Sequence, residues 1–158
     1  MPKPPDQVIS PDTIYTATIA TAKGDIVMDL DPRLAPKSVN NFVALARQGF
    51  YDGLTFHRVE PGFVIQGGCP EGSGRGGPGY RFEDEPVRGD YVQGAVAMAN
   101  AGPDTNGSQF FVCLEDLSGR LPKQYNLFGQ VTSGMDTVAD IRRGDVMQTV
   151  TITERPAG

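Results

Sequence analysis

The side chain that most invites a catalytic interpretation is the only histidine of the sequence, His57. An imidazole changes its charge near neutral pH, so a histidine can serve as a general acid or base. His57 directly precedes Arg58 in a segment with strand character, and neighbouring residues of a strand point to opposite faces. An arginine on a strand is, by itself, usually a surface charge. We expect His57 to have a structural or hydrogen-bonding role, on the face opposite to Arg58.

A second feature that could carry chemistry is the glycine-rich run Gly72–Gly77, which satisfies the dinucleotide-binding pattern G-x-G-x-x-G. That chemistry needs a helix directly after the glycines, because the helix N-terminus holds the phosphate. Here Pro78, Gly79 and Tyr80 follow, without a helical period. The run therefore indicates a flexible loop, and a nucleotide-using enzyme is the least favoured of the functions considered.

The remaining reactive groups are two widely separated cysteines, Cys69 and Cys113. Two cysteines at this spacing form neither a disulfide framework nor a metal cage, so we expect reduced thiols and no metal. The tripeptide Asn106-Gly107-Ser108 matches a glycosylation acceptor, but a cytoplasmic chain does not meet that machinery.

The composition excludes some classes of function. The chain has 14 Lys and Arg against 19 Asp and Glu, which gives a net charge of −5 and argues against a nucleic-acid surface. No stretch approaches the ~20 apolar residues of a membrane span, and the N-terminal residues lack an apolar signal core. We therefore expect a cytoplasmic protein that binds neither nucleic acid nor membrane.

The 158 residues fit one domain with a short extension in front of it. Residues 1–12 contain four prolines and little hydrophobic pattern. This predicts a flexible N-terminal lead-in before a domain that covers residues 13–158.

Two helices are predicted from apolar residues that recur with a period near 3.6. In residues 35–48 they stand at i, i+3, i+4 and i+7 from Val39. Pro36 suits the first turn of this helix, and Gly49 suits the position just beyond its end. A second helix is predicted over residues 134–143.

The rest of the pattern is typical of short strands between Gly, Pro and Asn-Gly turns. Eight strands are expected, over residues 13–22, 26–31, 54–59, 63–67, 95–99, 109–114, 127–131 and 146–153. Eight antiparallel strands can close into a barrel whose interior is just filled by side chains. The fold class is therefore mostly β, a closed eight-stranded antiparallel β-barrel capped by two α-helices.

Two longer motifs suggest a family. They read FHRVEPGFVIQGG over residues 56–68 and MANAGPDTNGSQFFV over residues 98–112. Both resemble the signature stretches of cyclophilin-type peptidyl-prolyl cis–trans isomerases. Shorter pieces with the same resemblance follow the order of the family, at residues 36–42, 82–85 and 127–131. The resemblance extends from Thr13 to Glu154 and also implies the capped barrel.

The resemblance implies that proline-containing peptides and unfolded proteins bind in a groove outside the barrel. The isomerase activity that it implies needs no cofactor or metal, and the resemblance also suggests a monomer. The expected catalytic residues are Arg58, Phe63, Gln66, Asn100 and Phe111. The expected substrate-binding residues are Val64, Ala99, Gln109, Leu121 and Tyr125. A proline-peptide-binding or chaperone module with incidental catalysis is the alternative function.

The resemblance also assigns roles within this groove. Arg58 is expected to donate a hydrogen bond to the prolyl nitrogen of a twisted amide, since a guanidinium is always charged and presents a rigid fork of donors. Phe111 is expected to hold the proline ring, and Phe110, its neighbour, to be buried in the core.

The segment from Asp116 to Tyr125 departs from the family pattern. Many members have a tryptophan near Leu121 that helps to hold cyclosporin-type ligands, and this chain has no tryptophan. We therefore expect such ligands to bind weakly while catalysis is retained. Tyr125 stands where a histidine is common, and its ring can still form a wall of the proline pocket.

Overall fold

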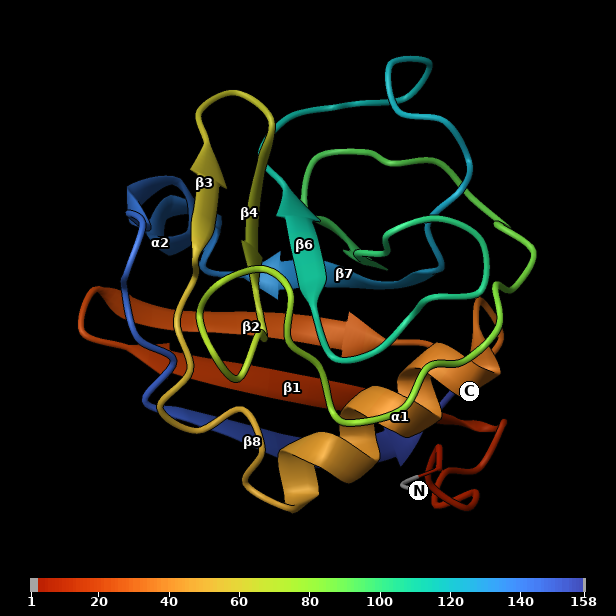
Figure 1. The fold of residues 1–158 in the computed structure, drawn as a ribbon. Helices are drawn as coiled ribbons and strands as arrows, with labels where there is room; N and C mark the ends of the chain where they lie inside the picture. The colour runs from red at the N-terminus through yellow and green to blue at the C-terminus, as the bar shows by residue number, and fades with distance from the viewer. Residues whose placement is uncertain (1–2, 158) are drawn as a thin grey trace.

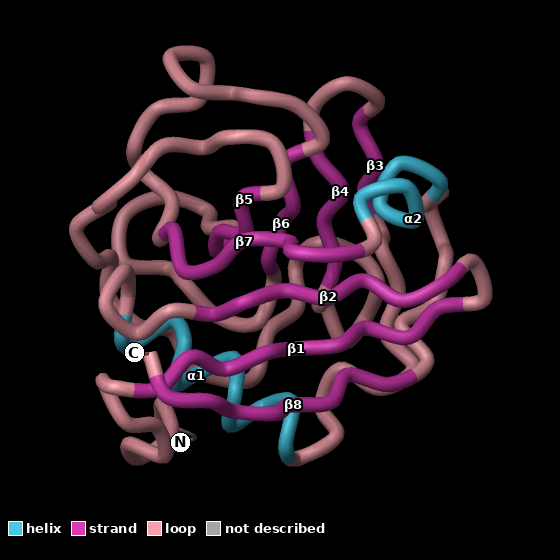
Figure 2. The backbone as a smooth tube through the Cα atoms, turned by 180° about the vertical axis from the view of Figure 1, so that it is seen from behind, coloured by secondary structure: helices cyan, strands magenta, loops and turns pink. Residues whose placement is uncertain are grey.

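The computed structural model describes residues 3–157. Their strands form one antiparallel sheet, with a helix at each of two opposite ends (Figures 1 and 2). The strands are β1 (Thr13–Thr21), β2 (Gly24–Leu30), β3 (Arg58–Glu60), β4 (Val64–Gly67), β5 (Ala95–Met98), β6 (Phe110–Cys113), β7 (Leu127–Ser133) and β8 (Thr149–Pro156). The helices are α1 (Pro36–Arg47) and α2 (Met135–Asp140). A mostly β fold with eight strands and two helices is therefore confirmed.

The sheet is open, which corrects the predicted closed barrel. Its strands follow the order β3-β4-β6-β5-β7-β2-β1-β8, so β3 and β8 are its two edges and do not pair within the described residues. Near these edges, the chain is joined by the isolated bridge Thr55↔Val146 and by loop hydrogen bonds such as Met147 N to Leu54 O, 2.8 Å.

The length of β3 explains why the sheet stays open. The strand predicted over residues 54–59 forms a ladder only from Arg58 to Glu60, whereas β8 is paired along its whole length with β1. Closure needs two edge strands that can form a continuous ladder, and three residues of β3 do not supply one. The alternation of residue types does not reveal where a ladder stops.

The strands at the centre of the sheet contribute side chains to two separate apolar clusters. Phe110 lies in the larger, inner cluster, which includes residues of α1, and Phe111 lies in a smaller, outer one. In the same way, Ile65 faces the inner cluster and Val64 the outer cluster. Successive side chains of a strand point to opposite faces, so each of these strands supports the core with one face and a groove with the other. The expected burial of Phe110 is confirmed, at 0% exposure.

Helix α1 contributes the aromatic centre of the inner cluster. The ring of Phe42 stacks on Tyr51 at 4.7 Å between centroids and meets the edges or tilted faces of Phe110 and Phe128 at 5.3 and 5.8 Å. The predicted bounds of this helix are correct to within one residue. Helix α2 is shorter than predicted, because Ile141 is extended (φ −61°, ψ 136°) and ends it after Asp140. No helix of residues 3–157 is long and apolar enough to cross a membrane.

The N-terminus of α1 is capped by a carboxylate from a distant loop. The preceding residue, Ala35, offers no side-chain cap. Instead Glu85 accepts hydrogen bonds from the backbone N–H groups of Lys37 and Ser38, each at 2.8 Å, and from the Ser38 hydroxyl at 2.8 Å. A negative charge is stabilising at this end of a helix. The cap ties the long connection between β4 and β5 to the core.

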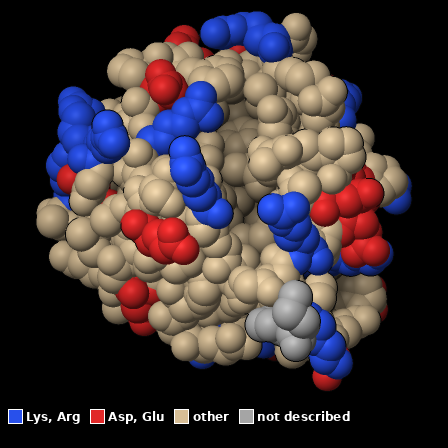
Figure 3. Space-filling model, in the orientation of Figure 1, with Lys and Arg blue, Asp and Glu red and all other residues tan. Residues whose placement is uncertain are grey.

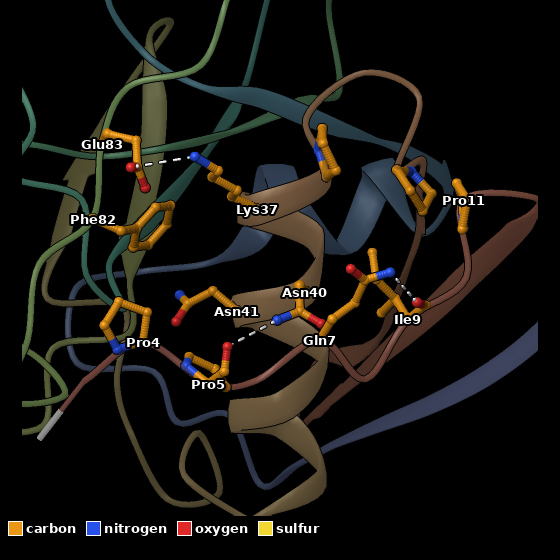
Figure 4. Close-up of a pocket in the computed structure, with 12 residues that line it drawn as sticks. Pro4, Pro5, Gln7, Ile9, Pro11, Lys37, Asn40, Asn41, Phe82 and Glu83 are labelled. Carbon is orange, nitrogen blue, oxygen red and sulfur yellow. Dashed lines mark hydrogen bonds and ion pairs between the residues drawn. The ribbon is translucent and has the colours of Figure 1, made fainter.

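Residues 3–12 lie across the outside of α1, as Figure 4 shows. The backbone N–H of Val8 donates to Asn40 Oδ1 at 2.7 Å, and Asn40 Nδ2 donates to the carbonyl of Asp6 at 3.2 Å. A cavity of about 430 Å³ lies between this segment and the helix. That residues 1–12 form a flexible lead-in stays a prediction, and residues 1 and 2 lie outside the described part.

The substitution Glu85→Ala is expected to lower the free energy of unfolding by about 1–2 kcal/mol, because three donors at the start of α1 lose their acceptor. Denaturant unfolding followed by circular dichroism measures this change. The matched control is Glu83→Ala, which removes an exposed ion pair to Lys37 (3.2 Å) worth less than about 1 kcal/mol. Equal losses for the two variants would show that Glu85 is no helix cap.

Candidate active site

Three strands place an arginine, a glutamine and a phenylalanine in one row across the outer face of the sheet. Arg58 of β3 pairs with Gln66 of β4, and Gln66 pairs with Phe111 of β6. Directly paired residues point to the same face. Strands lie about 4.8 Å apart, so the Cα atoms of Arg58 and Phe111 are about 10 Å apart, a gap that their side chains can span.

A tight turn fixes the register of this row. Between β3 and β4 the chain reverses over residues 60–63, where the N–H of Phe63 donates to the carbonyl of Glu60 at 2.9 Å. Pro61 and Gly62 occupy the two central positions, and Gly62 has the positive φ (+71°) that disfavours other residues. A turn of this length sets Arg58 opposite Gln66.

The row opens into a cavity of about 120 Å³ on the outer face. Nine of the ten residues expected to form the groove line it, namely Arg58, Phe63, Val64, Gln66, Ala99, Asn100, Phe111, Leu121 and Tyr125. The tenth, Gln109, lines an adjoining cavity of about 710 Å³ that shares Gln66, Ala99 and Asn100 with the first. The structure thus brings all ten residues to one region, which lies on the hollowed face in Figure 3.

A chain of side-chain amides leads from the glycine-rich loop to the arginine. Gln109 Nε2 donates to the carbonyls of Gly74 and Gly76, each at 2.9 Å, which leaves its oxygen as an acceptor. Gln66 Nε2 donates to that oxygen at 3.1 Å, and the Gln66 oxygen accepts from Arg58 Nη1 at 3.3 Å. Two loop carbonyls therefore fix the direction of both amides, and the Gln66 oxygen in turn holds the guanidinium of Arg58. The Nε of Arg58 also lies 3.5 Å from Glu60 Oε1.

Aromatic rings form the other side of the cavity. Phe111, only 4% exposed, meets the ring of Tyr125 edge to face at 5.4 Å between centroids. The ring of Tyr91 lies 6.5 Å from that of Phe111 and 6.4 Å from that of Tyr125 between centroids. Its hydroxyl donates to the Tyr125 carbonyl (2.6 Å) and accepts from the Tyr125 N–H (3.1 Å). The guanidinium carbon of Arg58 lies 6.0 Å from the centre of the Phe63 ring. The lining of the cavity thus combines one cationic side chain with several aromatic and aliphatic ones.

The glycine-rich loop is closed on itself rather than open to a phosphate. The N–H of Gly76 donates to the sulfur of Cys69 (3.3 Å), and the N–H of Arg75 donates to the hydroxyl of Ser73 (3.2 Å). Although burial opposes it, the backbone N–H groups of Gly76, Gly74, Glu71 and Ser73 lower the pKa of Cys69 to about 7. No helix follows the loop, so its geometry does not support the nucleotide hypothesis. Both Cys69 and Cys113 are free thiols.

His57 lies outside the cavity and packs against the glycine-rich loop, close to Gly74. Its two ring nitrogens are buried, and neither makes a hydrogen bond within residues 3–157. Burial, with the nearby charges of Arg58 and Arg143, lowers its pKa below the usual 6.5, although the side chain of Gln109 acts in the opposite direction. We expected a structural or hydrogen-bonding role for His57, and its buried nitrogens without a hydrogen bond among the described residues favour the structural one.

Comparison with known proteins assigns the family. The family described as cyclophilin type peptidyl-prolyl cis-trans isomerase/CLD matches residues 16–157. The chain belongs to this family. The resemblance noted in the sequence is therefore confirmed, and the chain is a peptidyl-prolyl cis–trans isomerase.

Several relatives of this cyclophilin-type isomerase carry the same description. The chain is 50% identical over 129 residues to peptidyl-prolyl cis-trans isomerase B of Bacillus subtilis, with 80% of this chain and 90% of the relative covered. It is 48% identical over 138 residues to an isomerase of Helicobacter pylori, with 85% and 84% covered.

Solved structures of a cyclophilin type isomerase from Cryptosporidium parvum are also similar. One has a TM-score of 0.82 and 31% identity, and covers 90% of this chain and 99% of its own. A second, described as determined in the presence of the dipeptide Ala-Pro, has a TM-score of 0.80 and 32% identity, with 87% and 98% covered.

Some residues that organise the cyclophilin groove were not identified from the sequence. Tyr91 lies 34 positions from Tyr125, and the loop carbonyls of Gly74 and Gly76 belong to no recognisable catalytic pattern. These contacts join distant or irregular segments. Glu60, by contrast, stands in the first motif two positions from Arg58, but no role was expected for it. Only the unusual density of glycine near position 74 signalled that the loop has a special conformation.

The depressed pKa of His57 predicts that the free energy of unfolding falls as the pH falls below 6.5. In the interval between the folded-state pKa and 6.5, the unfolded chain binds the proton and the folded chain does not, so acid favours unfolding. The variant His57→Gln should lack this contribution to the pH dependence of the free energy of unfolding. Because His57 is the only histidine, its imidazole signals can be followed directly in an NMR titration. A midpoint at or above 6.5 would contradict the burial argument.

Proposed function

We propose that the groove binds X-Pro peptides with the proline ring against Phe111, and that Arg58 accelerates rotation by stabilising the twisted amide electrostatically. The observation that supports this most directly is that Arg58 and Phe111 line the same cavity, on either side of Gln66 in one row across three strands. A proline ring on Phe111 would bring its imide nitrogen toward the guanidinium.

The barrier to rotation defines what the catalyst must do. The two isomers of an X-Pro bond differ by only about 0.5–1 kcal/mol, but amide resonance raises a barrier of ~18–20 kcal/mol between them. When the bond is twisted, resonance is lost and the prolyl nitrogen gains a free lone pair. A donor aimed at this nitrogen therefore stabilises the transition state more than the planar ground state.

Arg58 is suited to this donor role, although it accounts for part of the effect only. A hydrogen bond to a charged group contributes about 1.5–3 kcal/mol, whereas a ~10⁵-fold acceleration requires about 7 kcal/mol. The difference must come from a preorganised groove in which the donor needs no rearrangement. The amide chain through Gln66 and Gln109 supplies this preorganisation, since it holds the guanidinium before the peptide arrives.

The other residues of the groove hold the peptide so that one side of the bond turns against the other. Phe111, with Phe63, Val64 and Leu121, forms the apolar socket for the ring, and Tyr125 closes it. Gln66 and Asn100 orient the flanking chain, and Ala99 and Gln109 shape the adjoining space. The structural neighbour determined in the presence of Ala-Pro supports a proline-containing ligand. With Leu121 and no tryptophan, cyclosporin-type ligands would bind weakly.

The substitution Arg58→Ala is expected to reduce kcat/KM for a short X-Pro peptide by at least ~10²-fold, equivalent to about 2.7 kcal/mol of barrier. NMR exchange spectroscopy on the peptide measures the rate without a coupling enzyme. The matched control is Arg88→Ala, an exposed arginine outside both cavities, which should leave the rate within twofold. If Arg58→Ala keeps most of the activity, the proposed mechanism is wrong; if it loses catalysis but still binds the peptide, catalysis and binding are separate properties of the groove.

A further inference from the structure

A second cavity adjoins the proposed proline cavity on the same face of the molecule. It has a volume of about 710 Å³ and shares Gln66, Ala99 and Asn100 with its neighbour, so an extended peptide can cross from one to the other. Adjacent residues of an extended chain advance about 3.3–3.6 Å each, so a side chain two or three positions from the proline reaches this space.

The lining of this second cavity is positively charged. Arg75 and Arg81 contribute to it from the glycine-rich loop and the segment just after it, and its lining contains no aspartate or glutamate. Within residues 3–157 neither arginine has a carboxylate oxygen within 4.0 Å, unlike Arg33 and Arg155. This absence of acid is notable in a chain with a net charge of −5. Figure 3 shows blue side chains around the hollow on this face.

The other polar side chains of the cavity already donate hydrogen bonds inside the protein. The hydroxyls of Thr105, Ser108 and Tyr80 donate to Gly102, Gly68 and Asn41, respectively. The amides of Gln109 and Asn100 donate to the carbonyls named above and to that of Gln124. The two exposed guanidinium groups are therefore the charged donors of this cavity that a ligand can recruit, and guanidinium matches a carboxylate in two parallel hydrogen bonds.

We infer that Arg75 and Arg81 form a subsite for an acidic side chain near the proline, and that this isomerase prefers substrates with Asp or Glu at one position two or three residues away. The inference rests on the proposed function of the proline cavity. Both arginines are exposed, so each ion pair is weak and screened by salt. A combined preference of about three- to tenfold at low ionic strength is expected.

The test uses X-Pro peptides in matched pairs, with Glu or Gln at a single position from three residues before to three residues after the proline. For each pair, kcat/KM is measured by NMR exchange at low and at 0.5 M salt. The inference predicts a preference for Glu at one position on one side only, which declines in high salt. In the double variant Arg75→Gln, Arg81→Gln the ratio falls to about one, whereas Arg88→Gln keeps it.

A charge reversal makes the assignment specific. The double variant Arg75→Glu, Arg81→Glu is expected to prefer Lys over Gln at the same position. The inference is overturned if no position shows a ratio above twofold, or if the ratio survives in the Arg75→Gln, Arg81→Gln variant. These outcomes are distinct from a failure of the proposed function, in which the wild-type protein would catalyse exchange in none of the peptides, the Gln series included.

Discussion

The position of Arg58 beside Phe111 depends on one register shared by three short strands. Because Gln66 of β4 pairs with both residues, a shift of one position in either ladder would turn one of these side chains toward the core. The turn through Pro61 and Gly62 sets one ladder, and the inward packing of Phe110 in the inner cluster restricts the other. The groove is thus a consequence of how the core is packed on the opposite face of the same strands.

The register places the guanidinium, and the glycine-rich loop orients it. An exposed arginine has many rotamers, and a donor that must be ordered at the moment of reaction contributes less to the rate. Here two backbone carbonyls orient Gln109, Gln109 orients Gln66, and Gln66 accepts from Arg58. The loop is itself anchored inside by Cys69, so an irregular segment without a helix or strand controls the geometry of the cavity.

Much of this could be predicted from the sequence, and the exceptions have physical causes. The spacing of apolar residues in α1 and along the strands reflects which neighbouring positions are buried, so a short stretch of sequence is enough to predict these elements. The barrel was wrong because closure depends on the ends of β3 and β8, where pairing competes with loop hydrogen bonds. The resemblance to the family predicted ten groove residues, which the structure brings to one region, but it does not reveal contacts between distant segments, such as Tyr91 with Tyr125 or Glu85 with α1.

The most direct test of the central claim is a double-mutant cycle on kcat/KM that combines Gln109→Leu with Arg58→Lys. If the amide chain acts by orienting the fork of Arg58, the two effects are coupled. Gln109→Leu should then reduce kcat/KM about tenfold when Arg58 is present and less than about twofold when lysine replaces it, a coupling of about 1 kcal/mol. The same reduction in both backgrounds would contradict the account, because Gln109 would then act independently of the arginine.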